Sequence, residues 1–348
     1  MLLENLCFFL VALLVAAYAV VEGRSLGIAI LSLSARSAGE RERTLAKLGP
    51  TWPGASPWLL ALSAVLSSAF PRALITLSRG LTASLVALFA ALLLRAGAAE
   101  LRRRVARPRR HLCELLLGVW SALAALLLGI LAGQILRGVP LGPGTRLAGS
   151  ATLHPFPLLV GLVAACAFIV QGALYLRIEA AGERSERLAA IALLAFVSFL
   201  CLFAAATALT VEVSPFLFVR LSNFHMWLGG STLAAAAAIT PIATSAGRRR
   251  LAFWAASATV AALVLVSALS LYPGLVPSST TFEYSLTIYN AGAGGGSLRF
   301  ALATALFAGG AALGLHRLVH RPWHPVLKPR RPLPRSKETF PGPSSTPL

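Results

Sequence analysis

The residues with the clearest chemical potential interrupt the first apolar stretch as Glu22-Gly23-Arg24-Ser25-Leu26-Gly27. An ionisable side chain inside an apolar span costs about 2.5–3.5 kcal/mol on insertion scales, and it usually faces protein or a wet path. Glu22, Arg24 and Ser25 are therefore candidates for a proton path or another polar site, with Arg24 as a possible partner of Glu22. The alternative is a helix that ends near Val21, which would place both charges at the membrane interface.

The glycines of this segment indicate close packing against another helix. Gly23 and Gly27 are four residues apart, so they lie on one helix face and leave room for a neighbouring backbone.

Three further polar residues stand in apolar stretches. Glu114 follows a basic segment, and we expect it to balance Arg109 and Arg110 at the interface. Gln134 and Gln171 are isolated in their helices, and we expect both to form interhelical hydrogen bonds.

The chain offers no ligand set for a metal or a haem. Haem irons accept His or Met ligands, but His154, His225 and Met226 all lie near the ends of apolar stretches. The four cysteines lack metal-binding spacing. No phosphate-binding glycine loop and no Ser/His/acid arrangement occurs.

These residues must be positioned by elements that use lipid as their solvent. Of the 348 residues, 57% are apolar and only 12% are charged, which excludes an ordinary soluble enzyme. The acidic residues are all Glu, and the net charge is +19. The basic residues cluster in short gaps between apolar stretches, which is typical of membrane topology rather than of nucleic-acid binding.

The sequence predicts an all-α integral membrane protein with about nine spans. The predicted spans are 6–33, 57–70, 79–96, 113–136, 156–177, 188–211, 224–244, 251–272 and 299–316. Pro71 and Arg72 interrupt an apolar stretch, so the second helix could continue past a kink. Residues 1–316 form the membrane domain, and the basic, proline-rich tail 317–348 is expected to be disordered.

Basic residues orient the predicted spans. Alternate gaps together with the tail hold 24 of the 31 Lys and Arg residues, the opposite side holds six, and Arg24 lies inside the first apolar stretch. This asymmetry predicts an N-terminus outside and a C-terminus in the cytoplasm. Ala17-Tyr18-Ala19 resembles a signal-peptide cleavage site, but the preceding segment contains Glu4 and no basic residue, so we expect a retained helix.

Seven segments form an ordered set of motifs up to about residue 316: Glu22–Gly27, Leu48–Leu59, Ala69–Pro71, Gly133–Leu141, Tyr175–Arg187, Tyr272–Ser279 and Ser285–Ala291. The set resembles subunit II of cytochrome bd-type quinol oxidases. For example, Gly133–Leu141 is similar to the family pattern Gly-Asn-Leu-x-Gly-Val-Pro.

The resemblance implies two four-helix bundles plus a peripheral helix, in a bacterial inner membrane. It also implies a partner, subunit I, which binds b- and d-type haems, oxidises quinol and reduces oxygen to water. This chain is then expected to bind no cofactor and to be catalytic only within that complex. A small single-helix subunit is a further partner that the resemblance allows; nucleic acid is not an expected partner.

Departures from the family pattern affect the expected proton path. Ser25 stands where the family has Asp, while Pro53 and Ala55 replace the Asp and Asn of the loop before the second helix. Glu22 is then the remaining carboxylate of the first-helix motif. Either Glu22 suffices, or subunit I supplies all protons, or this chain has lost part of the oxidase role.

Two tryptophans are candidates for an access path or an interface. Trp58 matches the family Trp after that loop and could line a gas-access path, and Trp52 lies just before it. A place in the aromatic belt at the membrane interface is the alternative.

The alternative functions are a polytopic transporter or a structural paralogue without oxidase activity. The transporter is disfavoured because no clear internal repeat is visible.

Overall fold

The computed structural model describes residues 2–48, 51–141, 154–217, 224–280 and 282–319. The helices of the first half are α1 (Leu2–Leu31), α2 (Ala38–Ala46), α3 (Thr51–Ala69), α4 (Pro71–Gly80), α5 (Thr82–Arg104) and α6 (Arg107–Arg137). Those of the second half are α7 (Pro155–Arg177), α8 (Gly182–Val213), α9 (Phe224–Ser245), α10 (Arg249–Leu271) and α11 (Gly295–Val319). A short antiparallel hairpin, β1 (Gly274–Val276) and β2 (Leu286–Thr287), connects α10 to α11.

The predicted all-α membrane fold is confirmed, whereas the predicted count of nine spans is not. Within the described residues, seven helices are long and apolar enough to cross a membrane, or eight if the bent pair α3 and α4 is one span. The chain bends by 116° between these two helices, so it turns sharply at Pro71 instead of continuing past a mild kink. Proline suits the first position of α4 because its missing N–H has no helical acceptor there.

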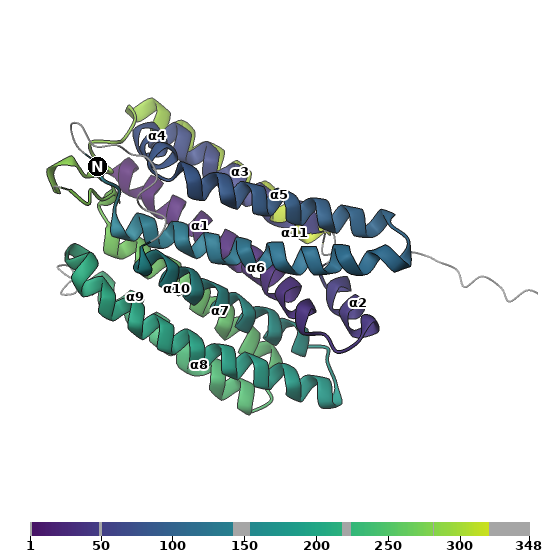
Figure 1. Cartoon of the computed structure of the whole chain (residues 1–348). Helices are drawn as coiled ribbons and strands as arrows, with labels where there is room; N and C mark the ends of the chain where they lie inside the picture. The colour runs from purple at the N-terminus through teal and green to yellow at the C-terminus, as the bar shows by residue number, and fades with distance from the viewer. Residues whose placement is uncertain (1, 49–50, 142–153, 218–223, 281, 320–348) are drawn as a thin grey trace, which may run out of the picture.

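The helices form two bundles (Figure 1). Helices α7, α8, α9 and α10 contact one another in a ring, and α1, α3, α5 and α6 form the second group. Helix α11 lies on the outside against α3 and α1. Helix α1 also contacts α7 and α10, and α6 packs along α7, so the two bundles meet through both α1 and α6.

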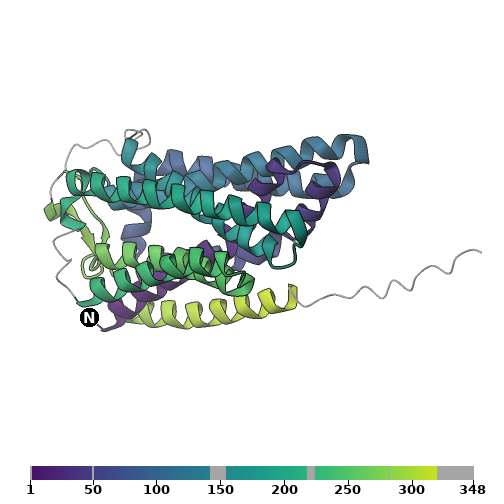
Figure 2. The same ribbon diagram turned by 90° about the horizontal axis from the view of Figure 1, so that it is seen from below.

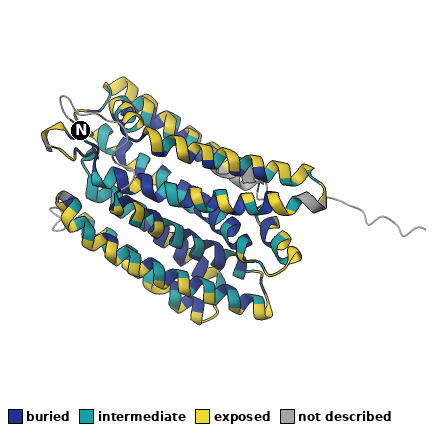
Figure 3. Ribbon diagram, in the orientation of Figure 1, coloured by how far each residue is buried: buried dark blue, intermediate teal, exposed yellow. Residues whose placement is uncertain are grey.

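The positions of the two ends of the described chain and the exposed apolar surface both fit a membrane protein. Helix α1 begins, and α11 ends, at opposite ends of the bundle (Figure 2). Exposed residues cover the outward faces of α5, α8 and α9, while the inner helices are mostly buried (Figure 3). Large apolar side chains such as Phe89, Leu194 and Ile242 are among those exposed. Apolar surface of this extent is stable where lipid, not water, covers it.

Candidate functional site

A buried ion pair between Glu22 and Arg95 is the central polar feature of the structure. Glu22 lies on α1 and Arg95 on α5, and their side chains are only 6% and 9% exposed. A guanidinium N–H of Arg95 donates to Glu22 Oε1. In an apolar interior, each charge would be strongly unfavourable without the other.

Arg95 uses all three of its nitrogens, so the pair joins three helices. Besides Glu22, the guanidinium donates to Ser25 Oγ on α1 and, from Nε at 2.9 Å, to Ser121 Oγ on α6. Ser121 donates in turn to the carbonyl of Leu117 at 2.6 Å. The polar site therefore consists of Glu22, Ser25, Arg95 and Ser121, and we refer to it as the Arg95 site.

This geometry corrects two sequence interpretations. Helix α1 continues to Leu31, so it does not end near Val21. The ion-pair partner of Glu22 is Arg95 rather than Arg24, because neighbouring positions on a helix point in different directions. Arg24 instead places its guanidinium 4.9 Å from the ring centre of Tyr175 on α7.

Sequence reasoning did not single out Arg95, because this residue lies at the end of the predicted span 79–96, close to the arginines of the basic gap that follows. In the structure, α5 continues to Arg104, which places Arg95 within the helix. The segment Ala96–Ala99 carried the missing signal, since it contains no charge after Arg95. An arginine followed by a further turn of apolar helix is a candidate for a buried position.

The predicted close packing beside the site is confirmed. Gly27 and Gly172 lie at the crossing of α1 and α7: a Cβ at Gly27 would lie 1.9 Å from the carbonyl oxygen of Phe168, and one at Gly172 would lie 2.5 Å from the carbonyl carbon of Gly27. Gly23 faces the Phe168 ring, where a Cβ would lie 2.4 Å from Cδ1. The glycines allow the backbones to approach, which sets the position of α1.

The two buried glutamines behave differently. Gln171 donates to the carbonyl of Val20 at 3.1 Å and to Ser257 Oγ at 3.0 Å, which confirms its predicted interhelical bonds. Gln134 is 1% exposed, and both atoms of its amide lack a partner among the described residues. The predicted bond of Gln134 is therefore wrong for this part of the chain, since no polar group of a neighbouring helix reaches it.

We expect Gln134→Met to stabilise the protein by about 1 kcal/mol, because an unpaired buried amide is replaced by an apolar side chain of similar size. The matched Gln171→Met should be destabilising, because it removes two bonds. The measurement is the thermal unfolding midpoint in detergent. Equal decreases for both variants would contradict the expectation.

The two tryptophan candidates differ in what the structure describes. Trp58 on α3 is 8% exposed within the hydrophobic core, so it does not belong to a lipid-exposed aromatic belt. Its Nε1 has no hydrogen-bond partner among the described residues. The side chain of Trp52, in the first turn of α3, lies outside the described residues.

Four sequence motifs meet at the end of the bundle where α1 begins. Val139 exchanges backbone hydrogen bonds with the segment that follows β1, donating to Pro277 O at 2.9 Å and accepting from Ser279 N at 3.0 Å. Gly138 has φ of 93°, and a Cβ there would lie 2.9 Å from Pro277 O, so glycine suits this position. Arg72 reaches the carbonyl of Asn290 at 3.3 Å, which adds the turn at Pro71 to the same assembly.

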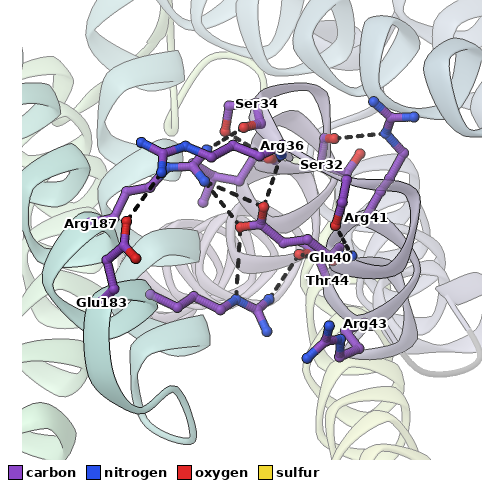
Figure 4. A network of polar contacts seen from close by, with 12 residues as sticks. Ser32, Ser34, Arg36, Glu40, Arg41, Arg43, Thr44, Glu183 and Arg187 are labelled. Carbon is purple, nitrogen blue, oxygen red and sulfur yellow. Dashed lines mark hydrogen bonds and ion pairs between the residues drawn. The ribbon is translucent and has the colours of Figure 1, made fainter.

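At the opposite, arginine-rich end, Glu40 on α2 is the centre of an ionic network (Figure 4). It accepts from Arg187 on α8 at 3.2 Å and from the backbone N–H of Arg36 at 2.8 Å. Arg184 approaches to 4.0 Å and donates to Thr44 at 3.0 Å. The network ties the short helix α2 to the start of α8.

The pKa of Glu40 is lowered overall. Burial raises this pKa, but the N–H of Arg36 and the charges of Arg187 and Arg184 together lower it by more. The pKa of Glu40 therefore lies below its ordinary value of 4.5. A carboxyl group with a depressed pKa in the folded state contributes stability above its unfolded pKa. That contribution is lost as the pH falls through the folded pKa.

We therefore expect Glu40→Gln to destabilise the protein by about 1 kcal/mol at neutral pH, the scale of a partly exposed pair. The difference in stability between Glu40→Gln and the wild type should shrink as the pH falls below 4.5. Unfolding midpoints measured across this pH range test the expectation. Glu186→Gln is the matched control, because Glu186 is exposed on α8 and forms no ion pair among the described residues. A difference in unfolding midpoint between Glu40→Gln and the wild type that stays constant with pH would exclude the ionic explanation.

Glu114 and His154 also have structural partners. Glu114 is 6% exposed and pairs with Arg102 at 3.0 Å and with Arg110 at 3.6 Å. The predicted Arg110 contact is thus present, Arg102 is an added partner, and the side chain of Arg109 lies outside the described residues. His154 caps the start of α7 by accepting from the N–H of Phe156 at 3.2 Å. Within the described residues, no three His, Cys, Asp or Glu side chains are grouped to hold a metal.

Comparison with known sequences gives a match along nearly the whole chain. A family model described as cytochrome bd terminal oxidase subunit II matches residues 3–319. The chain is 26% identical over 328 residues to cytochrome bd-I ubiquinol oxidase subunit 2 of Escherichia coli (strain K12), covering 83% of this chain and 86% of that protein. It is also 26% identical over 318 residues to cytochrome bd ubiquinol oxidase subunit 2 of Bacillus subtilis (strain 168), covering 85% and 88%.

A solved structure has the same fold. The chain matches a chain in the structure of bd oxidase from Geobacillus thermodenitrificans with a TM-score of 0.71 and 18% identity. The match covers 91% of this chain and 98% of that chain. The same helix arrangement is therefore present in both molecules at low sequence identity.

Proposed function

Because the chain belongs to the cytochrome bd terminal oxidase subunit II family, we propose that it acts as subunit II of a complex that oxidises quinol and reduces oxygen to water. The observation that carries this proposal is the family match over residues 3–319, which includes every motif of the ordered set. The transporter and the partnerless paralogue receive no support from any comparison.

The proposal assigns the redox chemistry to a partner subunit I. That subunit would hold the b- and d-type haems and bind the quinol, and this chain would complete the complex. His154 serves as a helix cap, which supports a structural use of this histidine. The chain would then be part of a quinol:oxygen oxidoreductase without being catalytic by itself.

We place the complex in the bacterial inner membrane, with the arginine-rich end of this chain in the cytoplasm. The opposite positions of the start of α1 and the end of α11 support termini on opposite sides of the membrane. The distribution of basic residues, 23 to six once the buried Arg95 is left out, supports an N-terminus outside.

Within the complex, we assign the Arg95 site first to anchoring α1 against α5 and α6. Arg95 donates to two polar residues that precede Leu26 in the first-helix motif, Glu22 and Ser25. A relay through Glu22 would need that carboxylate to exchange Arg95 for a proton. The geometry therefore favours a proton supply through subunit I over one through Glu22. Trp58 remains our candidate for an access-path wall, because its ring is buried and its helix α3 packs against α1 and α11.

The first test is purification of this chain from its native membrane in mild detergent. We expect a haem-bearing large subunit to copurify, with b- and d-type bands in the reduced-minus-oxidised spectrum and quinol-dependent oxygen uptake. A folded chain that purifies alone and colourless would overturn the oxidase function.

The role of Glu22 is tested separately with Glu22→Gln in the same complex. Anchoring predicts less assembled complex with unchanged oxygen uptake per haem. A relay predicts normal assembly with oxygen uptake per haem reduced, by about 10²–10⁴-fold where proton transfer limits the rate.

A further inference from the structure

A hollow at the arginine-rich end lies apart from the Arg95 site. It has a volume of about 540 Å³ and lies between the end of α7 and the start of α10. Its lining includes Ile178, Glu179, Arg248, Arg249, Arg250 and Leu251. Three consecutive arginines thus contribute to one shallow, open hollow.

The positive charge of this hollow is not balanced by carboxylates of the residues that the structure describes. Its one carboxylate, Glu179, is paired with Lys47. None of the three arginines forms an ion pair with a described residue; Arg249 donates to the backbone carbonyl of Ala180 at 2.5 Å. Guanidinium groups that lack carboxylate partners bind phosphate oxygens well, because their planar N–H groups match that geometry.

The backbone around the hollow is held in place by its own hydrogen bonds. Gly247 has φ of 70°, and Arg248 N donates to Ala243 O at 3.0 Å, which closes the tight turn between α9 and α10. At the end of α7, Arg177 donates to Thr244 O at 2.8 Å and ties that helix to the same turn. The arginines therefore project from a fixed turn. Binding a ligand would cost little conformational entropy for ordering the backbone of this turn.

The surface next to the hollow is apolar and faces outward. Leu251 lines the hollow and is 44% exposed, and Trp254, one turn further along α10, is 65% exposed. An exposed tryptophan near the end of a span is typical of the interface between lipid headgroups and acyl chains. The hollow therefore adjoins the surface on which acyl chains would lie.

From this combination, we propose that the hollow binds the phosphate group of an anionic membrane phospholipid. Arg248 and Arg250 would contact the headgroup, and Leu251 and Trp254 would contact the acyl chains. Basic pockets between membrane helices bind lipid headgroups in this way. A free phosphate ion would use the same arginines but would gain nothing from the apolar surface.

Native mass spectrometry of the detergent-purified protein, with whatever subunits copurify, tests the proposal. Phosphatidylglycerol and phosphatidylcholine with identical chains are titrated into the wild type and into Arg248→Gln/Arg250→Gln. At about 1 kcal/mol for each basic residue, the double variant should bind phosphatidylglycerol about 30-fold more weakly. Binding of phosphatidylcholine should not change, and Arg248→Lys/Arg250→Lys should retain the preference.

The matched control is Arg103→Gln/Arg104→Gln, which removes the same charge from exposed positions at the end of α5. Equal weakening in both double variants would overturn the site, because surface charge alone would then explain binding. Inorganic phosphate as competitor distinguishes the source of the ligand. Failure of phosphate to displace phosphatidylglycerol supports the lipid, whereas displacement at comparable concentration overturns it. The readout is lipid binding, so it is independent of oxidase activity.

Discussion

Arg95→Met is expected to destabilise the protein by about 3–5 kcal/mol, the range for removing one partner of a buried ion pair. The substitution leaves the Glu22 carboxylate, which is 6% exposed on its side chain, without a counter-ion. It also removes the donors to Ser25 and Ser121, so α1, α5 and α6 lose their shared polar contact. The measurements are the thermal unfolding midpoint and the yield of monodisperse protein in detergent.

A double variant separates lost pairing from lost packing. Glu22→Gln/Arg95→Met removes both charges, and we expect it to recover most of the stability, because replacing a whole buried pair is often close to neutral. Arg103→Met is the matched control on the same helix, since Arg103 is 54% exposed and its pair with Glu100 should contribute less than about 1 kcal/mol. Equal losses in Arg95→Met and Arg103→Met would show that the buried pair has no special role.

Gly27→Leu is expected to separate α1 from α7 and to cost about 3 kcal/mol or more, at or above the upper end for overpacked cores. The nearest atom to an added Cβ is the backbone oxygen of Phe168 at 1.9 Å, and backbone cannot rotate away as a side chain can. Gly172 lies at the same contact, so the helix axes must move apart. Because α1 joins both bundles, we expect a large loss of folded protein, measured by detergent size-exclusion profile and unfolding midpoint.

The control for this substitution is Gly97→Leu on α5. Gly97 is also helical, but an added Cβ there would have no atom within 4 Å. Leucine has the higher helix propensity, so Gly97→Leu should be neutral or slightly stabilising. A stable Gly27→Leu protein would mean that α1 and α7 can pack at a greater distance than the structure shows.

Much of the architecture was predictable from the sequence, because lipid exposure imposes a simple rule. Each helix must satisfy its backbone internally and be apolar along its length, so the spans are visible as apolar stretches. The glycine pair Gly23 and Gly27 also signalled close packing correctly. The sharp turn at Pro71 was less predictable, since proline is compatible with both a kinked helix and the start of a new one.

The sequence by itself determined the class of protein, the family and the position of an ionisable motif on the first helix. Only the tertiary structure decided which charge neutralises Glu22. Arg95 is 73 residues away, and no local periodicity relates the two. The same holds for the glutamines: both are isolated polar residues in apolar helices, yet Gln171 reaches Val20 and Ser257 while Gln134 reaches no described partner. A buried polar group is satisfied by whatever neighbouring helices present at its depth, and that depends on helix packing, which a single sequence does not encode locally.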